Sequence, residues 1–346
     1  MKALVYYGPG KRSWDEVPDP VITDPEDAVV RVDGFTICGT DLHILRGDVP
    51  EVESGRILGH EAVGTVTEVG PGVRNVAPGD GVLMSCINAC GRCRYCREGR
   101  YGQCLSGGGW VLGHLIDGVQ AEAVRIPFAD TSVHHLPDEV SDEAALMLAD
   151  ILPTSYEVGV LNGGVRPGDT VVIVGAGPIG LGAVMTAQLY SPMQIVVVDP
   201  VESRRAAALA LGATLVLSPD DDVAAEIRQL TDGLGADVAI EAVGVPATFD
   251  LAVSLVRPGG RVANVGVHGK PTTLHLEDLW IKDVTITTGL VDTFSTPTLL
   301  RMVRSGRLDA GRIVTHRFGF DQVPEAYDVF EDPATSGALK VAVFRS

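Results

Sequence analysis

Positive charge is scarce in this sequence of 346 residues. It holds 27 Lys and Arg against 45 Asp and Glu, which leaves a formal net charge of −18 at pH 7. Such a chain would repel the phosphates of DNA or RNA, so no nucleic-acid partner is expected. The acidity instead favours a soluble protein with a charged surface.

Segments that would lead the chain into a membrane are also scarce. The N-terminus, MKALVYYGPGK, has no long apolar core, so no secretory signal peptide is expected. Residues 170–187 run eighteen positions without a charge, long enough to suggest a membrane span. Four glycines and a proline interrupt this run, and a strand, a tight turn and a helix explain it better. We therefore expect a cytoplasmic protein with no membrane partner.

Cysteine is limited to six residues, and disulfides are not expected because cytoplasmic thiols stay reduced. Four of them, Cys90, Cys93, Cys96 and Cys104, follow the pattern C-x2-C-x2-C-x7-C. This spacing predicts a closed zinc site with four thiolates, which leaves no position for a substrate and is typical of a structural metal. Reactive or incidental thiols are the alternative. Cys86 is either a further candidate ligand or a buried spare thiol.

Two kinds of pattern divide the chain. Residues 1–150 contain short β-branched runs broken by glycine and proline, as in a compact, mostly β domain. From residue 169 onward, short apolar runs alternate with helical patterns, which predicts an α/β domain with a doubly wound parallel sheet. The strand candidates are TVVIV, QIVVV, TLVL, DVAIEAV, GRVANVGV and VTITTGL. The tail adds RIVTHRF, a predicted helix at VPEAYDVF, and a last strand, ALKVAVF.

The first of these strands leads into a glycine-rich turn. Gly175, Gly177 and Gly180 form G-x-G-x-x-G between a buried strand and a helix. The three glycines permit a tight turn, a close approach of the backbone to a pyrophosphate, and close packing of helix on strand. The helix N-terminus then favours phosphate charge. Together these features predict a dinucleotide site.

The next strand ends in Asp199, 22 residues after Gly177. A carboxylate at this place is suited to bind the adenosine ribose and to repel a 2′-phosphate, which favours NAD. A turn-forming Asp before a proline is the alternative, and Arg204 and Arg205 lie near enough to tolerate a phosphate.

Candidate reactive residues are spread over three segments. TICGTDLHILRG contains Cys38, Thr40 and His43; ILGHEAVG contains His60; and MLADILPTSYE contains Asp150. A Cys, a His and an acid make a three-ligand zinc set with an open fourth position. Spacing alone leaves the simpler alternative that the histidine is hydrogen-bonded and the cysteine packed in a core.

Five motifs occur in a characteristic order: CGTDLH, GHEAVGTVTEVGPGV, CGRCRYC, IVGAGPIG and GALKV. Together they resemble the zinc-dependent medium-chain alcohol dehydrogenases, and within them the bacterial tetrameric branch. The resemblance implies a homotetramer that acts on small molecules. It implies a GroES-like catalytic domain over 1–153 with a structural zinc lobe at about 86–108, a Rossmann domain over 154–292, and a return to the catalytic domain over 293–346.

The resemblance also implies site residues and two zinc ions per chain. Cys38, His60 and Asp150 match the ligands of the catalytic zinc, Glu61 matches the glutamate that can join or displace a ligand, and the four clustered cysteines match the structural site. Thr40 matches the hydroxyl that contacts the substrate oxygen, and His43 the histidine that relays its proton. The implied cofactor contacts are Thr154, Gly175, Gly177, Pro178, Ile179, Gly180, Asp199, Arg204, Val243, Val267, Leu290 and Lys340.

The implied activity is the interconversion of an alcohol and an aldehyde or ketone, with hydride transfer to or from NAD. Trp110 matches a tryptophan that lines the substrate pocket, although it could equally be a packed loop residue. The alternatives are a polyol or L-threonine-type dehydrogenase, a quinone or enoyl reductase without catalytic zinc, and a non-enzymatic NAD-binding protein.

Overall fold

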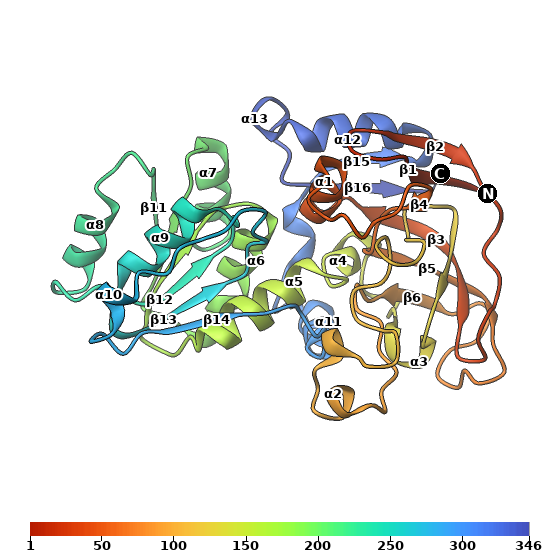
Figure 1. The fold of residues 1–346 in the computed structure, drawn as a ribbon, viewed down its shortest axis with the longest axis horizontal. Helices are drawn as coiled ribbons and strands as arrows, with labels where there is room; N and C mark the ends of the chain where they lie inside the picture. Colours follow the sequence, from red (N-terminus) through yellow and green to blue (C-terminus); the bar gives the residue numbers. More distant parts are fainter. Residues whose placement is uncertain (346) are drawn as a thin grey trace. The chain divides into compact units, whose positions relative to one another are not determined.

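The computed structural model describes residues 1–345, which fold into two compact units (Figure 1). The first unit comprises Met1–Pro153 together with the chain from Val291 onward. The second unit comprises Thr154–Leu290. The chain therefore leaves the first unit once and returns to it.

The first unit is built on β-sheets. A three-stranded sheet has the order β2-β1-β4, and a seven-stranded sheet has the order β15-β16-β3-β5-β6-β8 with β7 paired to β3. The strands are β1 (Lys2–Tyr6), β2 (Arg12–Glu16), β3 (Ala28–Thr36), β4 (Arg56–Ile57), β5 (Ala62–Val69), β6 (Gly81–Met84), β7 (Ala123–Ile126), β8 (Val133–His135), β15 (Val314–Gly319) and β16 (Lys340–Phe344). Strand β16 inserts between β15 and β3, so the C-terminal segment completes the larger sheet.

Short helices connect these strands. They are α1 (Gly39–Arg46), α2 (Arg94–Arg97), η1 (Tyr101–Gln103), α3 (Ala129–Ser132), α4 (Asp142–Leu146), α5 (Ile151–Thr154), α11 (Thr296–Arg304), η4 (Ala310–Ile313), η5 (Phe320–Gln322), α12 (Val323–Glu331) and α13 (Pro333–Ser336). The core includes Phe35 from β3 and Phe320, whose rings lie 5.3 Å apart, and the fully buried Tyr327 of α12. Helix α12 thus packs its apolar face on the sheet.

The second unit holds a six-stranded parallel sheet with the order β11-β10-β9-β12-β13-β14. Its strands are β9 (Thr170–Val174), β10 (Gln194–Val198), β11 (Leu215–Leu217), β12 (Ala236–Glu241), β13 (Val256–Asn264) and β14 (Thr285–Thr288). Its helical segments are η2 (Ser155–Leu161), α6 (Pro178–Ala187), η3 (Gln188–Tyr190), α7 (Glu202–Ala210), α8 (Val223–Leu230), α9 (Pro246–Leu255) and α10 (Leu276–Leu279). The predicted α/β class and all six predicted strands are confirmed.

The charge-free stretch at 170–187 consists of β9, the glycine turn and α6. Strand β9 lies at the centre of the sheet and every one of its residues is buried, which explains its lack of charge. Among the described residues, no helix combines the length and the apolar character needed to span a membrane.

Candidate active site

Four potential metal ligands meet in the first unit: Cys38, His60, Glu61 and Asp150. One ligand atom from each lies within 4.8 Å of the others. The Nε2 atom of His60 lies 3.3 Å from Oδ2 of Asp150, and Sγ of Cys38 lies 3.8 Å from the same oxygen.

The sheet register explains how these distant residues meet. Strands β3 and β5 pair antiparallel with Phe35 opposite Ala62, so Cys38, just after β3, comes close to His60, just before β5. Asp150 directly precedes α5. The cluster therefore depends on the sheet, and no short stretch of chain contains it.

The charge and burial of the cluster fit a metal ion. The Nδ1 atom of His60 and the Oε1 atom of Glu61 are buried without a hydrogen-bond partner among the described residues. Burial lowers the pKa of His60, but hydrogen bonds with Asp150 and Cys38 outweigh this effect and raise that pKa well above its usual value. Acidic groups thus favour positive charge here, and a thiol, an imidazole and a carboxylate suit zinc with one position left open.

Lys340, expected as a pyrophosphate contact, forms a buried ion pair with Glu61. Its side chain is fully buried in the first unit, and Nζ lies 2.6 Å from Oε2 of Glu61 and 2.9 Å from the carbonyl oxygen of Ile37. This contact has a physical reason: the buried carboxylate of Glu61 needs a counter-charge, and Lys340 supplies it. Burial lowers the pKa of Lys340, but Glu61 and Cys38 outweigh burial and raise it overall.

Thr40 and His43 lie on helix α1, directly after Cys38. The hydroxyl of Thr40 lies 3.6 Å from Sγ of Cys38, so it reaches the metal cluster. His43 is partly exposed, and its Nδ1 lies 2.8 Å from Oδ2 of Asp48. One helix therefore presents a hydroxyl near the cluster and an imidazole nearer to solvent.

Trp110 lies against the same cluster. Its ring meets that of His60 edge to face with 6.1 Å between centroids. It also stacks on His114 at 4.2 Å, and Nδ1 of His114 lies 3.0 Å from the carbonyl oxygen of Trp110. Trp110 therefore forms an apolar wall beside a candidate metal ligand.

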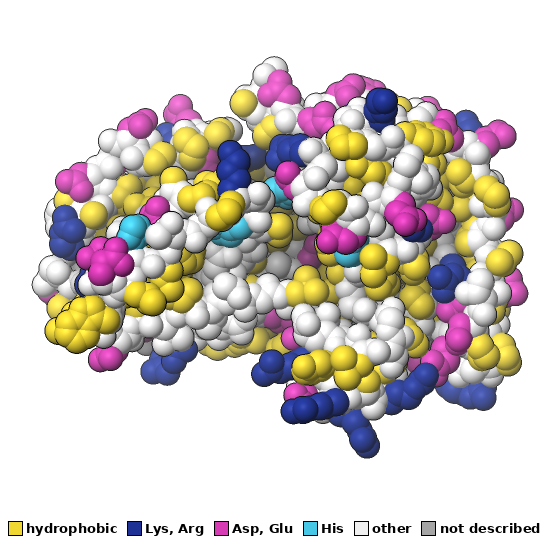
Figure 2. Space-filling model, viewed as in Figure 1, with side chains coloured by type: hydrophobic (Ala, Val, Ile, Leu, Met, Phe, Trp, Pro, Cys, Tyr) yellow, Lys and Arg dark blue, Asp and Glu magenta, His cyan; other side chains and the backbone are white. Residues whose placement is uncertain are grey.

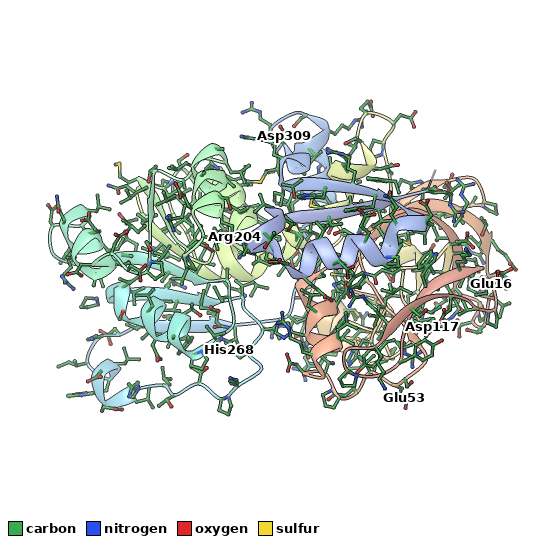
Figure 3. The ribbon with its side chains drawn as sticks, turned by 90° about the horizontal axis from the view of Figure 1, so that it is seen from above. Glu16, Glu53, Asp117, Arg204, His268 and Asp309 are labelled. Atoms are coloured by element: carbon green, nitrogen blue, oxygen red, sulfur yellow. The ribbon has the colours of Figure 1, made fainter. Side chains whose placement is uncertain are left out.

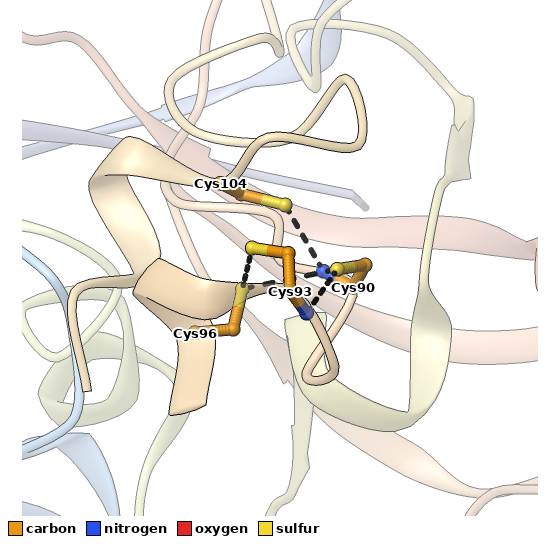
Figure 4. Close-up of side chains that lie close together, drawn as sticks. All are labelled: Cys90, Cys93, Cys96 and Cys104. Carbon is orange, nitrogen blue, oxygen red and sulfur yellow. Dashed lines mark hydrogen bonds between the residues drawn. The ribbon is translucent and has the colours of Figure 1, made fainter. Parts of the chain in front are cut away.

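The four clustered cysteines form a second site (Figure 4). Sγ of Cys96 lies 3.4 Å from Sγ of Cys93 and 3.9 Å from Sγ of Cys90. Burial raises the pKa of Cys90, but hydrogen bonds from Ser106 and backbone N–H groups lower it overall to about 6. All six cysteines lie in the described part of the chain and none forms a disulfide, and Cys86 is buried outside this cluster.

The arrangement of the four sulfur atoms fits a tetrahedral metal ion with no open position. The lobe that carries them is basic outside: Arg92, Arg94, Arg97 and Arg100 are all exposed, and Figure 2 shows blue side chains gathered where Figure 1 places α2.

The glycine turn in the second unit has the geometry that the motif predicts. Gly175 adopts a positive φ of 100°, which favours glycine. A Cβ atom at Gly180 would lie 1.9 Å from the carbonyl oxygen of Gly175, so a side chain is excluded there. A Cβ at Gly177 would meet no heavy atom within 4 Å, and Gly177 caps α6, which begins with Pro178 and Ile179. The turn can therefore receive a phosphate.

Asp199 follows β10 and is almost fully buried. Its Oδ2 accepts a 2.7 Å hydrogen bond from the backbone N–H of Ala176 in the glycine turn, and its Oδ1 accepts one from Val201. Asp199 therefore also holds the turn in shape. Arg204 lies on α7, where Figure 3 labels it.

The other expected cofactor contacts in this unit lie at strand ends or unit boundaries. Val243, Val267 and Leu290 follow β12, β13 and β14, and these residues are 42%, 57% and 44% exposed. Apolar side chains so exposed at the carboxyl ends of parallel strands are available to a ligand. Thr154 is the first residue of the second unit.

Some residues around the metal cluster had no role assigned from the sequence. They are Asp41, His114, Gln120 and Tyr327. Asp41 lies inside the CGTDLH motif, which was a usable signal. Gln120 and Tyr327 carry no local signal, because only the folded chain brings them near α1.

Comparison with known proteins places the chain in a family. Residues 24–138 match the alcohol dehydrogenase GroES-like domain, and residues 178–304 match the zinc-binding dehydrogenase domain. An alcohol dehydrogenase of Cupriavidus necator is 36% identical over 99% of this chain and 98% of its own. An L-threonine 3-dehydrogenase of Pyrococcus horikoshii is 33% identical over 91% of this chain and 90% of its own.

Among solved structures, zinc dependent alcohol dehydrogenase 2 from Streptococcus pneumonia in its apo form is 49% identical. It matches with a TM-score of 0.96, over 100% of this chain and 99% of its own. The chain belongs to the zinc-dependent medium-chain alcohol dehydrogenase family and is an oxidoreductase.

Proposed function

We propose that the cluster of Cys38, His60 and Asp150 is the reaction centre, where zinc and NAD together interconvert an alcohol and an aldehyde or ketone. The observation that carries this proposal is the buried meeting of three different ligand types, with polar atoms of His60 and Glu61 left without partners. A closed structural site would use all of its ligands on the metal, as four cysteines do. Glu61 is proposed as the alternate ligand.

Zinc, when bound, supplies Lewis acidity that lowers the pKa of a substrate hydroxyl. The chain's own residues then handle the proton. Oγ1 of Thr40, which lies 3.6 Å from Sγ of Cys38, would accept the proton of the substrate hydroxyl and release its own hydroxyl proton toward His43, which would pass a proton to solvent. Nδ1 of His43 lies 2.8 Å from Oδ2 of Asp48, and this contact orients the imidazole for that step.

The cofactor is proposed to be NAD, which takes up or supplies the hydride. The N–H groups and helix dipole at the glycine turn would hold its pyrophosphate. Asp199 retains lone pairs for the ribose hydroxyls after bonding Ala176 and Val201, and its charge would oppose a 2′-phosphate. Thr154, Val243, Val267 and Leu290 are proposed contacts, and Arg204 is the residue that would favour NADP.

The four-cysteine lobe is proposed to hold a second zinc ion with a structural role. We further propose a cytoplasmic homotetramer. Metal analysis of the purified protein should return two zinc ions per chain, and one or none would contradict the count.

The decisive experiment measures initial rates with NAD and with NADP over a panel of alcohols and carbonyl compounds. An apolar wall at Trp110 favours uncharged substrates, because a charged amino-alcohol would need a buried counter-charge. We expect short and medium aliphatic and arylalkyl alcohols to give higher kcat/KM than threonine or sorbitol, and NAD to be preferred. A best rate with threonine or a polyol would move the chain to that class of dehydrogenase. Absence of turnover across the panel would sink the proposed reaction centre.

A further inference from the structure

A chain of buried hydrogen bonds lies behind the candidate metal cluster. The hydroxyl of Tyr327 donates to Oε1 of Gln120 at 2.8 Å, and Nε2 of Gln120 donates to Oδ2 of Asp41 at 2.9 Å. The side chains of Tyr327, Gln120 and Asp41 are all buried. Breaking either hydrogen bond would leave a buried polar group without a partner, which costs free energy. The two hydrogen bonds therefore hold the three side chains in one arrangement.

Three distant segments contribute to this chain. Asp41 lies on α1, Gln120 precedes β7, and Tyr327 lies on α12 in the C-terminal segment. The backbone beside His60 packs directly on Gln120: Gly59 has a φ of 93°, and a Cβ there would lie 2.4 Å from Cγ of Gln120. The hydrogen-bonded residues therefore pack directly against the segment that carries His60.

Both hydrogen bonds have their donor on the Tyr327 side and their acceptor on the Asp41 side. Because the phenol of Tyr327 donates to the amide oxygen of Gln120, the NH₂ group of Gln120 faces Asp41. Oδ2 of Asp41 also accepts a 2.9 Å hydrogen bond from the backbone N–H of Cys38. The carboxylate oxygen Oδ2 of Asp41 thus accepts two hydrogen bonds, and Oδ1 accepts none from these two donors.

The other oxygen faces His60. Oδ1 of Asp41 lies 3.9 Å from Nδ1 of His60, and neither atom has a hydrogen-bond partner among the described residues. A histidine that binds a metal through Nε2 carries its proton on Nδ1, and that N–H is commonly given to a carboxylate. A hydrogen bond between these two atoms requires them to approach to about 3 Å.

We propose that Gln120 and Tyr327 are positioning residues that hold Asp41 toward Nδ1 of His60, so that Nε2 is presented to the metal. The inference rests on the proposed metal site at Cys38, His60 and Asp150. It adds Gln120 and Tyr327, which lie 60 and 267 positions after His60 in the sequence. Their hydrogen bonds are proposed to affect how strongly the metal is bound.

The test is the variant Tyr327→Phe, studied in the full-length protein. It removes one hydroxyl, keeps the buried ring, and keeps the stacking of Arg12, whose guanidinium lies 4.6 Å from the ring centroid. Loss of an outer-shell partner of a metal histidine typically lowers metal affinity 10- to 100-fold. Tyr327 acts on His60 only through Gln120 and Asp41, so its loss should have an effect near the lower end of this range. We expect about tenfold weaker zinc binding at the site of Cys38, His60 and Asp150. Binding at the four-cysteine site should not change.

The measurement follows zinc release to a competing chelator and the melting temperature of zinc-free protein. The four-cysteine site is an internal control within each molecule. Tyr7→Phe is a control variant in the same unit, because it deletes a tyrosine hydroxyl that donates to Asp15 at 2.8 Å and takes no part in the hydrogen bonds that join Tyr327, Gln120 and Asp41. We expect Tyr7→Phe to leave zinc release from both sites unchanged.

Gln120→Leu provides a second variant should Tyr327→Phe fail to fold. It should weaken zinc binding at least as much, and the double variant should add little to it, because both residues act through one chain. Equal zinc affinity in wild type and both variants, or a loss at both metal sites alike, would overturn the inference and leave the proposed function intact. Wild type that binds no metal at Cys38, His60 and Asp150 would overturn the proposed function and this inference with it.

Discussion

The two cysteine-containing clusters of this protein differ in how the chain builds them. The four-cysteine cluster uses one ligand type from residues 90–104, and backbone N–H groups point at its sulfur atoms: that of Cys93 lies 3.4 Å from Sγ of Cys90. The cluster at Cys38 uses a thiol, an imidazole and carboxylates from segments up to 112 residues apart. A local site can stabilise its own loop, whereas a site assembled across a sheet requires the whole unit to fold.

The surroundings of the two clusters differ as well. Around Cys38 lie Thr40, Trp110 and the buried pair of Glu61 and Lys340, which are groups able to act on a substrate or adjust charge. The four-cysteine lobe carries exposed arginines on its outer surface. We infer that the first cluster serves chemistry and the second serves stability, and the following changes separate the two roles.

Asp150→Ala should have the largest effect. It removes one of three proposed zinc ligands, and the metal supplies several kcal/mol of catalysis, so kcat/KM should fall by about a thousandfold or more. The four-cysteine site and the fold should remain, as measured by zinc content and circular dichroism. Full turnover by this variant would remove Asp150 from the ligand set.

Lys340→Met should affect stability rather than cofactor binding. It leaves the buried carboxylate of Glu61 without its partner, and breaking a buried pair from one side costs about 3–5 kcal/mol. The free energy of unfolding in urea should fall by that amount, with the Kd for NAD changed less than about twofold. A much weaker NAD affinity at unchanged stability would restore the pyrophosphate role for Lys340.

Cys93→Ser should lower the free energy of unfolding by more than about 3 kcal/mol, because the energy of a structural zinc site contributes directly to folding. The surviving folded protein should retain most of its turnover per molecule. Cys86→Ser is the matched control: Cys86 is buried outside the cluster, so the variant should keep both zinc ions and lose at most about 1–3 kcal/mol. Equal zinc loss in the two variants would count against the four-cysteine assignment.

Trp110→Ala should have the smallest effect, and on specificity alone. Removing the ring beside His60 enlarges the proposed pocket, so preference should shift toward bulkier alcohols by a few-fold to about tenfold. The ratio of kcat/KM for long and short alcohols measures this shift. Trp280→Ala, which changes an exposed tryptophan of the second unit, should leave the ratio unchanged. An identical ratio in both variants would make Trp110 a packing residue only.

Much of the fold could be predicted because its signals are local. The glycine motif and the apolar runs predicted β9 and its partners, and regular cysteine spacing predicted the four-cysteine cluster that the structure brings together. The meeting of Cys38, His60 and Asp150 followed only from resemblance to a family. Lys340 could not be placed from sequence, because nothing local reveals that β16 lies beside β3 and points a lysine at Glu61.

Because the chain returns to its first unit after forming the second, the two units are completed at different times during synthesis. Strand β16 pairs with β3 and carries Lys340, yet it comes after the entire second unit in the sequence. The continuous second unit therefore leaves the ribosome before the larger sheet of the first unit receives β16, its last strand in the sequence. Until then Glu61 has no lysine to neutralise it, so the candidate metal cluster reaches its final balance of charge only after the second unit has been synthesised.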